Sequence, residues 1–124
     1  MDEQSVLPQR VIGELMRTLP DNAIVTGDAG ENRIMMTHWY QTQQAGGFLQ
    51  AAGLGPMKFA IPAALGAKLV HPDRPIVAAC GDGGFAMTMN GLMSALEQDI
   101  PIRAAAGLSS RDSSAAARRM PRWR

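Results

Sequence analysis

The fold of this chain is decided by the stretch IVAACGDGGFAM at residues 76–87. Its first five residues are apolar or small and lie between Pro75 and a cluster of glycines, which is typical of a short buried strand. The apolar residues at the end of the stretch and beyond it recur at helical spacing, at Met87, Leu92, Met93 and Leu96. The stretch therefore predicts a strand, a tight glycine turn and a helix.

The turn has the composition of a phosphate-binding loop. Gly81, Gly83 and Gly84 allow the backbone to adopt left-handed angles and to approach a ligand closely. The start of the following helix offers unpaired N–H groups and the positive end of a dipole to an anion. We therefore expect a phosphate group at this turn.

Asp82 distinguishes two kinds of phosphate site. The run Gly81-x-Gly83-x-x-Ala86 satisfies a loose dinucleotide fingerprint, and Asp99 lies near the spacing expected of a ribose-binding carboxylate. However, a carboxylate at roughly 4 Å from a like charge costs about 4 kcal/mol at an effective dielectric constant of about 20. Mg²⁺ reverses the sign, because it binds few carboxylates and completes its shell with phosphate oxygens and water. The turn therefore favours a metal-bridged diphosphate, and a plain turn with Asp82 as helix N-cap is the structural alternative.

Composition divides the chain into two parts. Its 124 residues, 46% of them hydrophobic, allow one domain with a buried core, and the formal net charge is +1. Residues 1–102 have a charge balance of −4, whereas residues 103–124 contain six arginines and one aspartate, a balance of +5. We therefore separate a domain at 1–102 from a basic tail at 103–124.

Cysteine content and hydropathy bear on compartment and partners. A single cysteine excludes an internal disulfide, no apolar run approaches about 18 residues, and no signal peptide opens the chain. We therefore expect a cytoplasmic protein without a membrane partner. The basic tail has no interleaved aromatic residues and no amphipathic repeat, so nucleic acid is not expected as a partner either.

Helices and strands alternate along the rest of the sequence. Residues 5–19 predict an amphipathic helix, residues 23–26 a short strand, residues 34–40 a second helix and residues 60–70 a helix of small side chains. The overall order, α-β-α-β-α-β-α, predicts an α/β fold: a partial doubly wound parallel sheet with helices on both faces.

A second glycine-bearing junction follows the first predicted strand, with the sequence GDAGEN at residues 27–32. Ligands bind at the carboxyl ends of the strands in an open parallel sheet, so this junction and the turn at 81–84 are expected to line one site. Turn formation and helix capping are the alternative roles of Asp28, Glu31 and Asn32.

With these motifs in view, the chain resembles the diphosphate-binding domain of thiamine-diphosphate enzymes of the acetolactate synthase, pyruvate oxidase and 2-oxoacid decarboxylase type. The resemblance covers about residues 8–102. Glyoxylate carboligase, sulfoacetaldehyde acetyltransferase and benzoylformate decarboxylase share the pattern, so it does not identify the substrate. The motifs, in order, are GDAGEN at 27–32, GLGPM at 53–57, IPAALGA at 61–67, HPDRP at 71–75 and GDGGF at 81–85.

The resemblance implies thiamine diphosphate and Mg²⁺ as cofactors. Asp82 would be the metal ligand, and the glycines around it would bring backbone groups to the diphosphate. Met57 would support the bent form of the cofactor, with core packing as its alternative role. The cofactor-binding residues implied are Asp28, Gly30, Glu31, Asn32, Gly53, Leu54, Gly55, Met57, Gly81, Asp82, Gly83 and Gly84.

The resemblance also implies that part of the active site is missing. In the family the cofactor carbanion attacks a 2-oxoacid, after a glutamate from a separate domain of a partner subunit has protonated the aminopyrimidine. No part of this chain resembles that domain, and Glu31 and Glu97 lie in other motifs. We therefore expect no catalytic residue here, but a fragment of a homo-oligomeric enzyme that is inactive alone. The alternatives are a binding module that works with a separate pyrimidine-domain chain, and a dinucleotide-binding domain.

Two positions depart from the family pattern. Lys58 stands where a glycine usually follows Met57, which we expect to weaken cofactor binding. The family's metal motif ends in asparagine after a second apolar strand, but here those positions read RAAA at 103–106 and GLSS at 107–110. Because RAAA has low strand propensity, we expect residues 103–124 to be a divergent tail, disordered or out of frame, that leaves the central strand with an unpaired edge.

Overall fold

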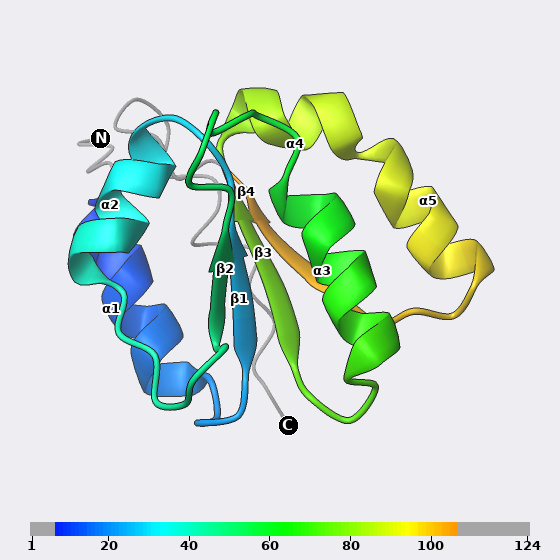
Figure 1. Cartoon of the computed structure of the whole chain (residues 1–124), viewed down its shortest axis with the longest axis horizontal. Helices are drawn as coiled ribbons and strands as arrows, with labels where there is room; N and C mark the ends of the chain where they lie inside the picture. The colour runs from blue at the N-terminus through cyan, green and yellow to red at the C-terminus, as the bar shows by residue number, and fades with distance from the viewer. Residues whose placement is uncertain (1–6, 107–124) are drawn as a thin grey trace, which may run out of the picture.

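A four-stranded parallel sheet with helices on both faces forms the centre of the computed structural model, which describes residues 7–106 (Figure 1). The strand order is β2-β1-β3-β4, and every neighbouring pair is parallel. The predicted α/β class and parallel sheet are confirmed. The elements are α1 (Pro8–Thr18), β1 (Ile24–Gly27), α2 (Glu31–Trp39), β2 (Phe48–Gln50), α3 (Ala60–Val70), β3 (Ile76–Cys80), α4 (Asp82–Thr88), α5 (Asn90–Glu97) and β4 (Arg103–Ala106).

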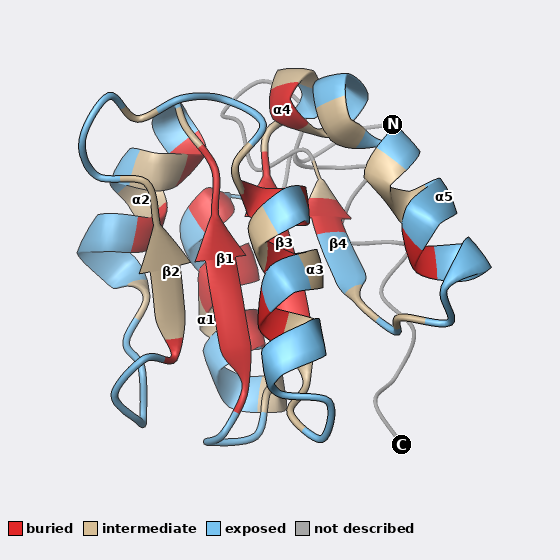
Figure 2. Ribbon diagram, turned by 45° about the vertical axis from the view of Figure 1, so that its right-hand side comes forward, coloured by how far each residue is buried: buried red, intermediate tan, exposed pale blue. Residues whose placement is uncertain are grey.

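Each face of the sheet has its own hydrophobic core, because side chains alternate between the two faces along a strand. Val25 and Val77 pack against α1 and α2, whereas Ile24 and Ile76 pack against α3. Figure 2 shows that β1 and β3 are buried along their whole length and that the edge strands are less so. Burial on both faces explains why β1 and β3 are nearly uninterrupted runs of apolar residues.

Small side chains allow α3 to lie close against the sheet. Ala60 and Ala64 are buried on its inner side, next to Ile61. The Thr26 hydroxyl of β1 donates a hydrogen bond of 2.7 Å to the Ala60 carbonyl oxygen, which satisfies a fully buried polar side chain. The first turn of α3 is thereby held at the carboxyl end of β1, beside the predicted site.

The sheet extends past the domain boundary that we expected at residue 102. Residues 103–106 form β4, which pairs in parallel with β3 and places Ala106 opposite Cys80. The prediction that these residues form no strand is therefore wrong. Ala105 packs in the core on the α1 and α2 face, and this tertiary packing outweighs the low intrinsic strand propensity. The remainder of the tail, with its expected disorder, lies outside the described residues.

The apolar residues after the glycine turn do not form one buried stripe. The helix is interrupted at Met89, between α4 and α5. Leu92 packs against the core under α3, whereas Met93 and Leu96 are 59% and 76% exposed. The interruption separates Met87 on α4 from the other three residues on α5, and of those three Leu92 alone packs against the core, so helical spacing does not by itself predict which residues share a buried face.

Truncation of Ile61 should destabilise the fold, because this side chain is fully buried between α3 and the sheet. Ile61→Ala is expected to lower the free energy of unfolding by about 2–5 kcal/mol. The matched control is Leu69→Ala on the same helix, where the side chain is 68% exposed and a change of about 0.5 kcal/mol or less is expected. Urea denaturation of both variants provides the measurement, and equal losses would contradict the assigned orientation of α3.

Candidate functional site

The two glycine-bearing junctions meet at the carboxyl end of the sheet. One follows β1 and the other follows β3, and these strands are parallel neighbours. The N–H of Asp28 donates a hydrogen bond of 3.0 Å to the Ala79 carbonyl oxygen, which connects the first junction to the carboxyl end of β3. The structure therefore brings together two segments that are about fifty residues apart in the sequence.

Asp28 is a buried carboxylate that holds three segments together. Its side chain is at the end of β1 and is only 3% exposed. Oδ1 accepts a hydrogen bond of 3.0 Å from the backbone N–H of Phe59, just before α3. Oδ2 lies against Gly84 in α4, where an added Cβ would overlap this oxygen and lie 2.9 Å from Cγ. Asp28 thus fixes the spacing between β1, α3 and α4.

Asn32 contributes a buried acceptor that has no partner. Its Nδ2 donates a hydrogen bond of 2.6 Å to the Ala29 carbonyl oxygen and lies 3.4 Å from the position that a Cβ on Gly81 would take. Oδ1 is buried and has no hydrogen-bond partner among the residues that the structure describes. A buried polar atom without a partner costs about 1–3 kcal/mol. A donor or a cation supplied by a ligand would remove this cost, so Asn32 fits a binding site.

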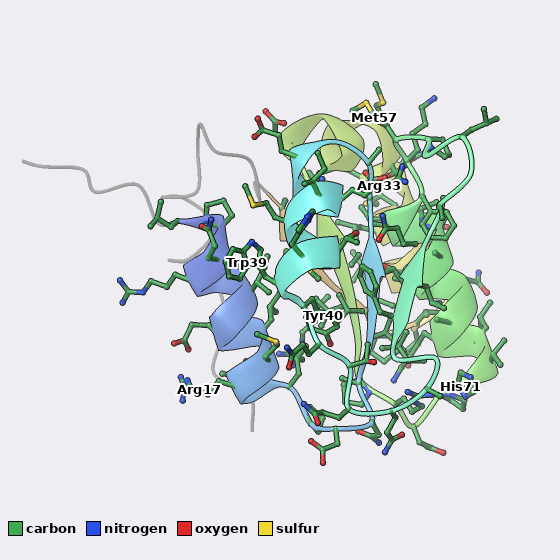
Figure 3. The ribbon with its side chains drawn as sticks, turned by 60° about the vertical axis from the view of Figure 1, so that its left-hand side comes forward. Arg17, Arg33, Trp39, Tyr40, Met57 and His71 are labelled. Carbon is green, nitrogen blue, oxygen red and sulfur yellow. The ribbon has the colours of Figure 1, made fainter. Side chains whose placement is uncertain are left out.

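Met57 lies over the glycine turn. Its Cε is 2.9 Å from the position that a Cβ on Gly83 would take, and 43% of the side chain is exposed. Figure 3 shows Met57 at the opposite end of the molecule from His71. The exposure does not agree with core packing, which was the alternative role of this methionine. Met57 can therefore contact a ligand bound at the turn.

Asp82 is the first residue of α4, and its carboxylate is exposed. Oδ1 accepts a hydrogen bond of 2.8 Å from the Gly83 N–H, while the N-cap position belongs to Gly81. Among residues 7–106 no group of three or more His, Cys, Asp or Glu could hold a metal ion. A cation at Asp82 would therefore take most of its ligands from phosphate and water, which is how Mg²⁺ is usually bound beside phosphates.

Comparison with known proteins identifies the family. The family model described as "Thiamine pyrophosphate enzyme, C-terminal TPP binding domain" matches residues 28–105. The chain belongs to this family. Its ligand, thiamine pyrophosphate, is the thiamine diphosphate implied by the motifs. The match begins at the buried aspartate and ends within β4, so it includes both junctions.

Curated relatives of this thiamine pyrophosphate-binding domain are much longer proteins. A probable acetolactate synthase large subunit of Methanococcus aeolicus is 39% identical over 106 residues, covering 82% of this chain and 18% of that protein. Acetolactate synthase isozyme 3 large subunit of Escherichia coli (strain K12) is 33% identical, with 80% and 17% covered. Sulfoacetaldehyde acetyltransferase of Alcaligenes xylosoxydans xylosoxydans is 32% identical, with 78% and 16% covered. The chain spans less than a fifth of the length of these relatives.

The other residues implied by the resemblance lie around the turn at varying distances. Gly30 precedes α2 with a φ of 84°, and Glu31 is the exposed first residue of that helix. Gly53 and Leu54 lie in the loop between β2 and α3, and Leu54 is fully exposed. Beyond its chain neighbours, no atom lies within 4 Å of the position that a Cβ on Gly53 would take. The structure therefore does not bring this pair against the glycine turn.

Lys58 departs from the family pattern at a strained position. Its φ is 76°, in the left-handed region that glycine adopts without cost. A residue with a Cβ pays about 1–2 kcal/mol there. The glycine that the family usually has at this position is explained by the backbone angle, and the lysine places a positive charge directly beside Met57.

Two other polar residues of this region do not belong to the site. Burial, and secondly the charge of Asp28, raise the pKa of Cys80 to about 12, so this thiol is neutral at pH 7 and is no nucleophile. Asp99 follows α5 and precedes β4, which runs parallel to β3, so it lies toward the amino ends of the strands. A ribose-binding carboxylate is required at the other end of the sheet. The assignment of Asp99 to a dinucleotide site is therefore wrong.

Sequence reasoning missed two contributors to the geometry. Phe59 acts through its backbone N–H, for which no side-chain pattern exists. Arg33 extends from α2 to the loop before α3 and donates to the Ala52 carbonyl oxygen. Its position directly after the GDAGEN junction was the available signal, but a lone arginine does not indicate which segment it contacts.

Addition of a methyl group at Gly84 should be tolerated poorly. Gly84→Ala is expected to lower the free energy of unfolding by about 1–3 kcal/mol, because the new Cβ overlaps the held carboxylate of Asp28. Gly13→Ala in α1 is the control, since nothing lies within 4 Å of its Cβ position and alanine is the better helix former by about 0.5–1 kcal/mol. Thermal unfolding should thus move in opposite directions, and a gain in both variants would disprove the contact.

Proposed function

We propose that this chain supplies the diphosphate and metal side of a thiamine-diphosphate active site of the acetolactate synthase type, which acts on 2-oxoacids. The observation that supports this best is the convergence of Asp28, Asn32 and the turn at 81–84 at the ends of β1 and β3. The relatives named acetolactate synthase large subunit support the reaction class. When bound, the cofactor supplies the nucleophilic carbon and accepts electrons, and the protein binds and orients it.

The residues of the turn would hold the diphosphate through their backbone. Gly81, Gly83 and Gly84 have no side chains that would block the close approach of a phosphate. The N–H of Gly83 donates to Asp82 Oδ1 in this structure. Asp82 would hold Mg²⁺, which would supply positive charge against the repulsion between this carboxylate and a diphosphate. The unpartnered Oδ1 of Asn32 would accept a hydrogen bond from a water or another donor bound with the cofactor.

Met57 would contact the cofactor from the loop before α3. Its position over Gly83 places a thioether beside the turn that receives the diphosphate. A polarisable, unbranched side chain can adapt to an aromatic ring. The adjacent Lys58 adds a positive charge at this edge, and its strained backbone contributes to the weaker cofactor binding that we expect from this departure.

The chain alone would lack the activation step. The glutamate that protonates the aminopyrimidine in the family has no counterpart in the motifs of this chain. The proposal covers two arrangements, a fragment of a homo-oligomeric enzyme and a module that works with a separately encoded pyrimidine domain. Both versions assign the same binding role to residues 28–84.

We also propose a cellular compartment and two candidate reactions. We propose the cytoplasm on the grounds of a single, buried cysteine. None of the helices within residues 7–106 is long and apolar enough to cross a membrane. Relatives carry the names acetolactate synthase and sulfoacetaldehyde acetyltransferase, so carbon–carbon bond formation on a decarboxylated donor and transfer of an acetyl group are the two chemistries to test.

Asp82→Asn should weaken binding of thiamine diphosphate in the presence of Mg²⁺ by about tenfold or more while leaving the fold intact, because the exposed carboxylate is the metal ligand and the glycines of the turn remain. Isothermal titration with Mg²⁺ and with EDTA provides the measurement. Asp73→Asn, at an exposed position in the turn after α3, is the control. Equal affinity of the wild-type chain in Mg²⁺ and in EDTA would refute the metal role.

The purified chain should release no carbon dioxide from pyruvate beyond the rate of free cofactor and Mg²⁺, because the activating glutamate is absent. Carbon dioxide release is measured by a coupled assay on a preparation free of host enzymes. A gain of turnover on addition of a chain that contains a pyrimidine domain would favour the module over the fragment. Turnover by the chain alone would contradict the proposal.

A further inference from the structure

Arg33 connects α2 to the loop between β2 and α3. Its Nη2 donates a hydrogen bond of 3.3 Å to the Ala52 carbonyl oxygen. The guanidinium also lies against Gly55: an added Cβ there would overlap Nη1 and lie 3.3 Å from Cζ. Figure 3 shows Arg33 and Met57 at the same end of the molecule, with Arg33 coming from α2. One side chain therefore contacts the loop at two points.

The loop is shaped to receive this guanidinium. Gly55 has a φ of 58°, which a residue with a side chain adopts only with strain, and it also has no room for a Cβ because of Arg33. One turn further along α2, Thr37 Oγ1 lies 3.1 Å from Gln50 Oε1 and 2.8 Å from the Arg33 carbonyl oxygen, and its single hydroxyl hydrogen is available to either acceptor. The end of β2 and the first part of the loop are thus held by the same helix.

The same loop presents the groups that define the binding site. Met57 lies over Gly83, and the Phe59 N–H donates to the buried carboxylate of Asp28. Both follow Gly55 by no more than four residues. A shift of the loop at Gly55 would therefore move the methionine and the hydrogen bond to Asp28 together.

We propose that Arg33 is a positioning residue that fixes the loop at residues 51–59, so that Met57 covers the glycine turn and Phe59 bonds to Asp28. Arg33 forms no ion pair within residues 7–106, so its planar, branched donor group acts here through shape and direction. Lysine lacks that planar group and cannot replace it. The consequence for cofactor binding rests on the proposed function, whereas the effect on the loop does not.

Hydrogen exchange of the full chain without cofactor tests the effect on the loop. Arg33→Met keeps an unbranched stem but removes the guanidinium and its donors, and Arg33→Lys keeps the charge. In both variants the amides of residues 51–59 are expected to exchange about tenfold faster than in the wild-type chain, because a hydrogen bond from a charged donor is lost. The amides of β3 are expected to exchange at the wild-type rate. Arg17→Met is the control, since Arg17 is exposed on α1 and pairs with Glu14. Unchanged exchange in the loop would overturn the proposal.

A comparison of two glycines keeps the proposal testable if the arginine variants fold poorly. Gly46 also has a positive φ, 73°, but nothing lies within 4 Å of its Cβ position. Gly46→Ala therefore measures the cost of the backbone angle alone, and Gly55→Ala adds displacement of Arg33. We expect Gly55→Ala to reduce the folding equilibrium constant more than Gly46→Ala, because the guanidinium must leave its contact with the loop. Equal reductions in the two variants would show that the guanidinium does not hold the loop.

Titration of Mg²⁺ and thiamine diphosphate into the same variants connects the loop to binding. Arg33→Met is expected to weaken the affinity by about tenfold, while Arg17→Met binds as the wild-type chain does. If the wild-type chain binds no cofactor, the proposed function fails, but the exchange measurement still decides the role of Arg33. If loop exchange rises and affinity is unchanged, the positioning of Met57 by Arg33 is refuted as a contribution to the site.

Discussion

A buried carboxylate at the end of β1 is the constraint on which the geometry of this domain depends. Burial of an ion is costly unless hydrogen bonds compensate for it. Asp28 meets this condition with the Phe59 N–H, and it determines where α4 begins because Gly84 packs directly against the carboxylate. The same charge contributes to the raised pKa of Cys80. The Asp28 side chain needs a glycine at position 84 in α4 and the backbone N–H of Phe59 before α3. Its position at the end of β1 therefore restricts which residues the other two segments can have.

Much of the fold was predictable because its signals are local. The parallel sheet around β1 and β3, with helices between the strands, follows from short apolar runs that end in glycine-bearing junctions, as in residues 76–84. Other parts depend on tertiary contacts that no local pattern contains. β4 exists because Ala105 is small enough to pack on the α1 and α2 face beside β3, although RAAA is a poor strand sequence. β2 has only three residues, too few for a period to be read from them.

The candidate site divides in the same way. The two junctions and Met57 were predictable from motifs, and the structure places Met57, Asp28 and Asn32 around the glycine turn. The groups that hold them in place were not, since Phe59 contributes only its backbone and Arg33 acts on a loop that is distant in the sequence. A motif indicates which kind of ligand its residues can bind. The distances between those residues depend on contacts between segments that are far apart in the sequence. Leu54, which the motif includes, is fully exposed in this structure, and its contact with the cofactor stays a prediction.

Apolar side chains are exposed at the candidate site. Met57 is 43% exposed and Leu54 is fully exposed, both on the loop before α3. Asp82 is exposed beside them, whereas Asp28 and Asn32 are buried below. Within residues 7–106, Asn32 Oδ1 is a buried side-chain acceptor without a hydrogen-bond partner. Under the proposed function, this chain would bind the diphosphate end of the cofactor, and a separate domain would enclose the aminopyrimidine end over the exposed loop. Binding of the diphosphate and activation of the cofactor would then be separable, because the first would depend on β1, β3 and the loop at 51–59, and the second on the separate domain.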